Sequence, residues 1–83
     1  MKRDFLIIGK KECSFTKKMI KFLDENDDDY TMEIKYVNID FQEKEFKDKF
    51  GKDATYPRVY EEKKNGILIF FGGADESLEK LKK

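Results

Sequence analysis

The chain has 83 residues, too few to build two hydrophobic cores, and we expect a single domain over residues 1–83. Its 18 basic and 18 acidic residues cancel, so no overall charge predicts a nucleic-acid or membrane partner. One cysteine excludes an intramolecular disulfide, and the absence of histidine excludes a Cys–His catalytic pair. The apolar run near the start is too short for a signal peptide or membrane span, so we expect a cytoplasmic protein.

The only cysteine, Cys13, lies where a strand is predicted to turn into a helix. Residues 5–8 form a short apolar run typical of a buried strand, and Gly9 is expected to take the turn that follows. Apolar residues then recur with helical spacing at Phe15, Met19, Phe22 and Leu23. Cys13 would therefore lie at the first residues of a helix, where free backbone N–H groups and the helix dipole stabilise a thiolate.

The side chains around Cys13 also favour its ionisation. Lys10 and Lys11 come just before it, and the hydroxyl of Thr16, three residues later, is placed to donate to the sulfur. Such surroundings lower the pKa of a cysteine. The alternative is a small buried hydrophobic residue without chemistry, which is the commonest role of a lone cysteine. The polar neighbours favour the reactive cysteine.

The rest of the chain alternates between strand and helix patterns. The acidic run at 24–29 predicts a solvated loop and lacks the spacing and glycine of a calcium site. A strand over 32–39 is followed by a helix over 41–50, capped by Asp40. Strands at 58–61 and 67–71, joined by an Asn-Gly turn, predict a hairpin before a last helix from Ala74. The order βαβαββα predicts an α/β fold, a four-stranded mixed sheet flanked by three helices.

Three motifs occur in order along the chain, each following a predicted strand or preceding one. They are Cys13-Ser14-Phe15-Thr16, Thr55-Tyr56-Pro57 and Gly72-Gly73-Ala74-Asp75-Glu76. Together they resemble the Cys-Pro-Tyr-Cys, Thr-Val-Pro and Gly-Gly-Cys-Asp-Asp motifs of the glutaredoxin family, and Lys10 matches the family's lysine three residues before the cysteine. The resemblance covers nearly the whole chain. It implies a thioredoxin-like fold, a cis Tyr56–Pro57 bond facing Cys13, and glutathione as co-substrate.

The resemblance also implies which residues bind glutathione. They are Lys10, Phe15, Thr55, Tyr56, Pro57, Gly73, Ala74 and Asp75. Lys10 would meet the glycyl carboxylate, and the backbone of Tyr56 would pair with the peptide as an added strand does. The backbone N–H groups of Ala74 and Asp75 would bind the γ-glutamyl carboxylate, and the Asp75 carboxylate its ammonium. Phe15 either lines this groove or packs in the core.

The sequence departs from the family pattern at three positions. Thr16 replaces the second cysteine, so the dithiol route is closed. Ser14 replaces the proline, which frees one more backbone N–H near the sulfur. Ala54 stands where the family often has a basic or amide side chain, a place that Lys52 is a candidate to fill.

These observations leave three functions open. The first is a monothiol glutaredoxin, a monomer in which Cys13 reduces protein–glutathione mixed disulfides, with glutathione and glutathionylated proteins as partners and no metal or permanently bound cofactor. The second is a carrier of a [2Fe–2S] cluster, held by Cys13 from two subunits and two glutathiones. Ser14 favours this carrier, whereas the short spacing from Lys10 to Cys13 disfavours it. The third is a domain that only binds a partner, in which Cys13 would have an ordinary pKa.

Overall fold

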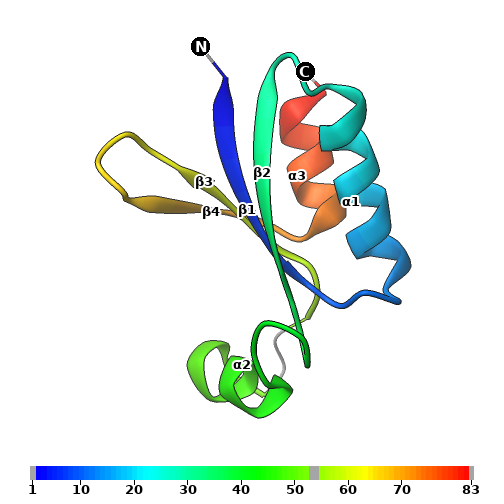
Figure 1. Ribbon diagram of the computed structural model, residues 1–83, viewed down its shortest axis with the longest axis vertical. Helices are drawn as coiled ribbons and strands as arrows, with labels where there is room; N and C mark the ends of the chain where they lie inside the picture. Colours follow the sequence, from blue (N-terminus) through cyan, green and yellow to red (C-terminus); the bar gives the residue numbers. More distant parts are fainter. Residues whose placement is uncertain (1, 53–54, 83) are drawn as a thin grey trace.

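A four-stranded mixed sheet forms the centre of the molecule in a computed structural model, which describes residues 2–52 and 55–82 (Figure 1). The strands are β1 (Arg3–Gly9), β2 (Tyr30–Tyr36), β3 (Arg58–Glu62) and β4 (Leu68–Gly72), in the spatial order β2-β1-β3-β4. β1 runs parallel to β2, and β3 is antiparallel to both β1 and β4. The parallel pair and the hairpin that the sequence predicts are present, and the structure adds that they meet at β1.

Two helices, α1 (Ser14–Glu25) and α3 (Ala74–Leu81), pack side by side on one face of the sheet (Figure 1). Alternate residues of β1 point to this face, which is why Phe5 and Ile7 are buried. The core also takes in apolar residues from β3 and from both helices. Its buried members are Phe5, Ile7, Met19, Leu23, Val59, Ala74, Leu78 and Leu81. Each large apolar side chain among them stabilises the fold by about 1.5–3 kcal/mol.

The end of α1 explains the acidic loop. The side-chain amide of Asn26 donates to the carbonyl oxygen of Phe22 at 2.8 Å, and the backbone N–H of Asn26 donates to Leu23. The residues that follow are exposed up to Asp29, whose carbonyl oxygen accepts the N–H of Arg3 at the start of β1. Over the described residues, no group of three or more His, Cys, Asp or Glu side chains could hold a metal ion. The predicted solvated loop is therefore found at 26–29, whereas Asp24 and Glu25 belong to the last turn of α1 and were wrongly placed in the loop.

The segment between β2 and α2 (Glu43–Phe50) differs from the prediction. Asp40 does not cap the helix, because its carboxylate accepts the N–H of Tyr36 at 2.8 Å, and Gln42 is the N-terminal cap residue instead. Ile39 is 63% exposed and lies outside β2, which ends at Tyr36. The predicted cap and the predicted end of the strand are therefore both wrong.

Helix α2 lies beyond the ends of β1 and β2 and not over a face of the sheet (Figure 1). Its apolar side is covered locally by aromatic rings. The ring of Phe46 stacks on Tyr56 with 4.5 Å between centroids, and Phe50 lies 4.9 Å from Phe46. α1 and α3 thus cover one face of the sheet, whereas α2 reaches the opposite face through Phe50, whose ring lies 6.5 Å from that of Tyr60.

The hairpin between β3 and β4 follows the predicted Asn-Gly turn. Gly66 has a φ of +83°, which favours glycine, and the side-chain oxygen of Asn65 accepts the N–H of Ile67. The N–H of Lys63 donates to the carbonyl oxygen of Ile67 at 2.9 Å. Along β4 the N–H and C=O groups of successive residues point alternately toward β3 and away from it. Because those of Ile67 point toward β3, those of Leu68 and Phe70 point to the free edge of β4.

The fold is therefore thioredoxin-like, with the predicted element order and the predicted mixed sheet. The predicted cis peptide bond between Tyr56 and Pro57 is present. None of the helices in the described residues is both long enough and apolar enough to cross a membrane.

Candidate functional site

Three segments far apart in the sequence meet at one end of the sheet. Ile8 pairs with Arg58, so Pro57 lies beside the carboxyl end of β1, where the chain leads to Cys13. Gly73, just before α3, lies on the other side of Pro57, because a Cβ added to Gly73 would be 3.8 Å from the Pro57 carbonyl oxygen. The three motifs found in the sequence are thus brought together.

Cys13 is the N-terminal cap residue of α1, one position before the helix begins. Its N–H donates to the carbonyl oxygen of Lys10 at 3.0 Å, which closes a tight turn, and its carbonyl oxygen accepts the N–H of Lys17 at 3.0 Å. The side chain is half-buried and forms no capping hydrogen bond. The residue is therefore held at the positive end of the helix while part of it stays open to solvent.

The surroundings of the sulfur lower the pKa of Cys13 below its ordinary value. Partial burial is the largest single influence and raises the pKa, because it disfavours the anion. The backbone N–H of Thr16, the hydroxyl of Thr16, the backbone N–H of Phe15 and the charge of Lys10 all lower it, and together they outweigh burial. The contacts of Thr16 and Lys10 thus act in the direction expected from the sequence, and stabilisation of the thiolate at this helix start stays a prediction.

Thr16 is held in place by Gly9. Its side chain is fully buried, and a Cβ added to Gly9 would lie 2.5 Å from the Thr16 methyl carbon, so only glycine leaves room here. The Thr16 oxygen accepts the N–H of Lys10 at 3.4 Å, which leaves the hydroxyl proton free to point at the sulfur of Cys13. Gly9 is the last residue of β1, and so its role is close packing rather than the predicted turn.

Phe15 lies on the surface beside Cys13. Its side chain is 50% exposed, in contrast to Met19 and Leu23 on the same helix, which are buried. Of the two roles left open for Phe15, packing in the core is therefore wrong. An exposed ring two residues from the sulfur remains available to line a groove.

Asp75 lies near the start of α3, and its carboxylate pairs with Lys18 of α1 at 3.2 Å. Both side chains are well exposed, so this ion pair contributes at most about 1 kcal/mol and leaves Asp75 accessible to a ligand. Lys18 was not predicted as part of the site. Only the packing of α1 against α3 brings it to Asp75, and neither helix pattern carries that information.

The remaining predicted residues border the same end of the sheet. Gly73 caps α3 and Ala74 is buried at its first position, where the leading N–H groups of a helix have no partner within it. Thr55 is exposed. Burial raises the pKa of the Tyr56 phenol, as does the charge of Glu43. Ala54 lies outside the described residues, and Lys52, its proposed substitute, is exposed just before it.

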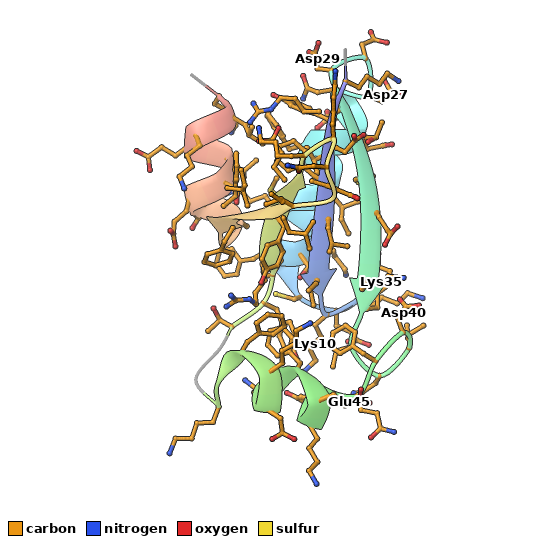
Figure 2. All side chains as sticks on the ribbon, turned by 90° about the vertical axis from the view of Figure 1, so that its left-hand side faces the viewer. Lys10, Asp27, Asp29, Lys35, Asp40 and Glu45 are labelled. Carbon is orange, nitrogen blue, oxygen red and sulfur yellow. The ribbon has the colours of Figure 1, made fainter. Side chains whose placement is uncertain are left out.

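Lys10 and the acidic loop after α1 lie at opposite ends of the sheet. Figure 2 shows Lys10 at the end of the sheet near α2, while Asp27 and Asp29 lie at the opposite end. The acidic loop is therefore remote from the sulfur, and Lys10 is the charged side chain that lowers the pKa of Cys13.

Comparisons with protein-family models, with curated proteins and with solved structures found no match. What the site can do therefore follows from its geometry. A half-buried cysteine whose pKa is lowered is suited to attack a disulfide sulfur as its thiolate. The start of α3 offers free backbone N–H groups to an anion.

Proposed function

We propose that this protein is a cytoplasmic, glutathione-dependent thiol–disulfide oxidoreductase that reduces protein–glutathione mixed disulfides through Cys13 alone. The observation that carries the proposal is the half-exposed Cys13 at the start of α1, with a pKa below its ordinary value. The arrangement of Pro57 and the start of α3 at the same end of the sheet supports it. A thiolate so placed is both the nucleophile and the leaving group that thiol–disulfide exchange requires.

The reaction has two exchange steps. In the first, the Cys13 thiolate attacks the glutathione sulfur of the mixed disulfide; a new S–S bond joins Cys13 to glutathione, and the substrate protein leaves as a thiolate that takes up a proton. In the second, the thiolate of another glutathione attacks the bound glutathione sulfur, which releases glutathione disulfide and the Cys13 thiolate. Each step exchanges one S–S bond for another, and the two electrons come from the two glutathiones.

Glutathione binding is assigned to the residues around the sulfur. Lys10 would pair with the glycyl carboxylate, and the backbone of Tyr56 with the central peptide. The N–H groups of Ala74 and Asp75 would bind the γ-glutamyl carboxylate. The Asp75 carboxylate would take the ammonium group in exchange for Lys18, and that exchange costs little because the existing ion pair is exposed.

The test is turnover of a small glutathione mixed disulfide by glutathione, coupled to glutathione reductase. Cys13→Ser should abolish turnover, since no other residue of the chain carries a thiol. Thr16→Ala should keep most of it, because Thr16 assists the thiolate and takes no covalent part. Turnover by the Cys13→Ser protein at the wild-type rate would overturn the proposal.

The iron–sulfur carrier remains a prediction with less support. The hydrogen bond from the Cys13 N–H to the Lys10 carbonyl keeps the turn before the sulfur short, whereas monothiol glutaredoxins that bind a cluster have a longer loop between the lysine and the cysteine. A visible absorption spectrum of freshly purified protein distinguishes the two, since a bound cluster absorbs and a thiol does not. Slow alkylation of Cys13 at neutral pH would favour the third function, a domain that only binds a partner.

A further inference from the structure

The face of the sheet opposite α1 and α3 carries apolar side chains that these two helices do not cover (Figure 1), and Phe50 of α2 reaches it, with its ring 6.5 Å from that of Tyr60. Cross-strand partners share a face, and the pairs Leu6↔Tyr60, Ile8↔Arg58 and Tyr60↔Phe70 place these side chains together. Leu68, two residues from Phe70, is on the same face. Phe70 is 49% exposed and Leu68 45%. We call this surface the open face; its members are Asp4, Leu6, Ile8, Thr31, Glu33, Lys35, Arg58, Tyr60, Glu62, Leu68 and Phe70.

Arg58 on the open face has a charge without a carboxylate partner among the described residues. Its guanidinium lies between the rings of Phe50 and Phe70, 4.3 Å from each centroid, and its Nε donates to the Tyr60 hydroxyl at 3.0 Å. The rings hold the planar group in one orientation and shield its two sides from water. Its remaining N–H groups are thus oriented to receive a carboxylate from outside the chain.

The charges of the open face are sorted along the strands. Asp4 pairs with Glu62 in the register at one end, and Ile8 pairs with both Lys35 and Arg58 at the other. Glu62, like Arg58, makes no ion pair within the described residues. One end of the face is therefore acidic and the other basic.

Arg58 and Glu62 are related by a simple symmetry. They lie four residues apart on β3, about 13 Å, with Tyr60 midway between them. A two-fold axis that lies between two such faces, at right angles to the strands and over Tyr60, would place each Arg58 on the Glu62 of the other copy. The same rotation brings together the apolar side chains around Leu6 and Phe70.

We propose that the open face is the interface of a symmetric homodimer, in which Arg58 of each copy pairs with Glu62 of the other around a centre formed by Tyr60 and Phe70. This inference is independent of the redox proposal, and it replaces the monomer expected from the sequence. An acidic peptide would match Arg58 but would be repelled by Asp4 and Glu62, whereas a second copy matches both ends. The face thus favours a copy of this chain as its occupant.

The size of the open face sets the strength of the dimer. Four strands about 4.8 Å apart, over the five residues of β3 and β4, present a flat area of about 300 Å². Stable interfaces bury about 800 Å² of accessible surface on each partner. The dimer is therefore weak and forms with rising protein concentration.

Sedimentation equilibrium under reducing conditions tests the proposal, since the reductant prevents a disulfide between two Cys13 side chains. The average mass of the wild type should rise toward twice that of one chain between about 10 µM and about 1 mM, the range of a weak complex. Arg58→Glu and Glu62→Arg should each remain monomeric, because each variant faces its own copy with two like-charge contacts. An equal mixture of the two variants should restore the dimer, because both contacts then join opposite charges.

Glu79→Arg on the exposed side of α3 is the matched control, since it makes the same charge change away from the open face and should associate as the wild type does. Glu62 is exposed and makes no ion pair, so its variant tests the interface even where Arg58→Glu disturbs the aromatic stack. A wild type that stays monomeric at the highest concentration overturns the proposal. If Glu62→Arg associates as the wild type does, the proposal is overturned. It is also overturned if the equal mixture of Arg58→Glu and Glu62→Arg stays monomeric.

Discussion

At the scale of single residues, the reactivity of the sulfur depends on a contact behind it. Gly9 has no side chain, and so Thr16 can lie directly on β1 with its hydroxyl beneath Cys13. The acceptor side of that hydroxyl is occupied by the N–H of Lys10. Thr16 thereby becomes a donor to the thiolate.

Thr16→Val should raise the pKa of Cys13, because valine keeps the shape of threonine and lacks the hydroxyl that stabilises the anion. The rate of alkylation followed against pH would then show its midpoint at higher pH, with slower reaction at neutral pH. Thr16→Ser retains the hydroxyl and should keep the midpoint near that of the wild type. An unchanged midpoint in the valine variant would mean that the hydroxyl does not face the sulfur.

The same thiolate links stability to pH. Because the pKa of Cys13 is lowered in the folded chain, ionisation stabilises the fold above the ordinary thiol pKa of about 8.5, and this contribution is lost as pH falls through the folded value. Thr16→Val, which raises the folded pKa, reduces that contribution without changing its sign.

Gly9→Ala should destabilise the protein by about 1–3 kcal/mol, the usual cost of overpacking, since its new methyl group would collide with the Thr16 side chain. Thr16→Ala removes the two nearest atoms, at 2.5 and 2.7 Å, and should relieve the collision. Urea denaturation of both single variants and the double variant measures this coupling. Strictly additive effects would show that the two residues do not touch.

At the scale of elements, an ion pair fixes β1 against β3. Arg3 of β1 donates to both carboxylate oxygens of Glu61, at 2.8 and 3.0 Å, and Lys63 adds a third contact at 3.2 Å. Glu61 is buried, so its charge depends on these partners. The hydrogen bond from Arg3 lowers the pKa of Glu61 despite the opposing effect of burial, and Lys63 lowers it further.

Glu61→Gln should therefore cost about 2 kcal/mol at neutral pH, as expected for hydrogen bonds to a charged group. A lowered folded pKa means that the wild type has this stability above the ordinary glutamate pKa of about 4.3 and loses it as pH falls through the folded value. The stability difference between the two proteins, measured by denaturation at several pH values, should then shrink in acid. A constant difference would show that Glu61 is not ionised in the fold.

The elements themselves were readable from sequence because each has a strong local signal. Alternating apolar residues mark β2, and the Asn-Gly pair marks the hairpin. Asp40 was wrongly predicted as a helix cap because the carboxylate of a short side chain can accept a hydrogen bond in a turn as well as at a helix start. Here it accepts the N–H of Tyr36 in a turn. The contact between Gly9 and Thr16 and the pairing of Lys18 with Asp75 depend on how elements pack, which no local pattern encodes.

At the scale of the whole molecule, the acidic loop and Lys10 lie at opposite ends of the sheet. Lys10 lies at the end that holds Cys13, and Asp27 and Asp29 lie at the other (Figure 2). The net charge of zero gives no sign of where Lys10 and the acidic loop lie. The position of α2 beyond the sheet could likewise not be predicted from the amphipathic pattern of that helix. Its apolar side packs on aromatic rings such as Tyr56, which the pattern does not distinguish from the face of a sheet.

Lys10→Ala should raise the KM for glutathione by a factor of about two to five, since an exposed ion pair contributes up to about 1 kcal/mol. The double variant Asp27→Asn/Asp29→Asn makes the chain more positive at the remote end and should leave the KM unchanged. Steady-state kinetics at low and moderate salt would show the difference, and the Lys10 effect should weaken as salt rises. Equal effects of both changes would point to overall charge and not to Lys10.

The two edges of the sheet are not alike. β2 presents Glu33 and Lys35 beside its free edge, whereas no charged residue lies in β4, where the backbone groups of Leu68 and Phe70 point outward. A bare, uncharged edge can accept a strand from any loosened neighbour. When the protein is heated, pairing of strands from other chains with that edge will thus compete with refolding. The protein concentration will then determine whether the sample refolds on cooling or precipitates.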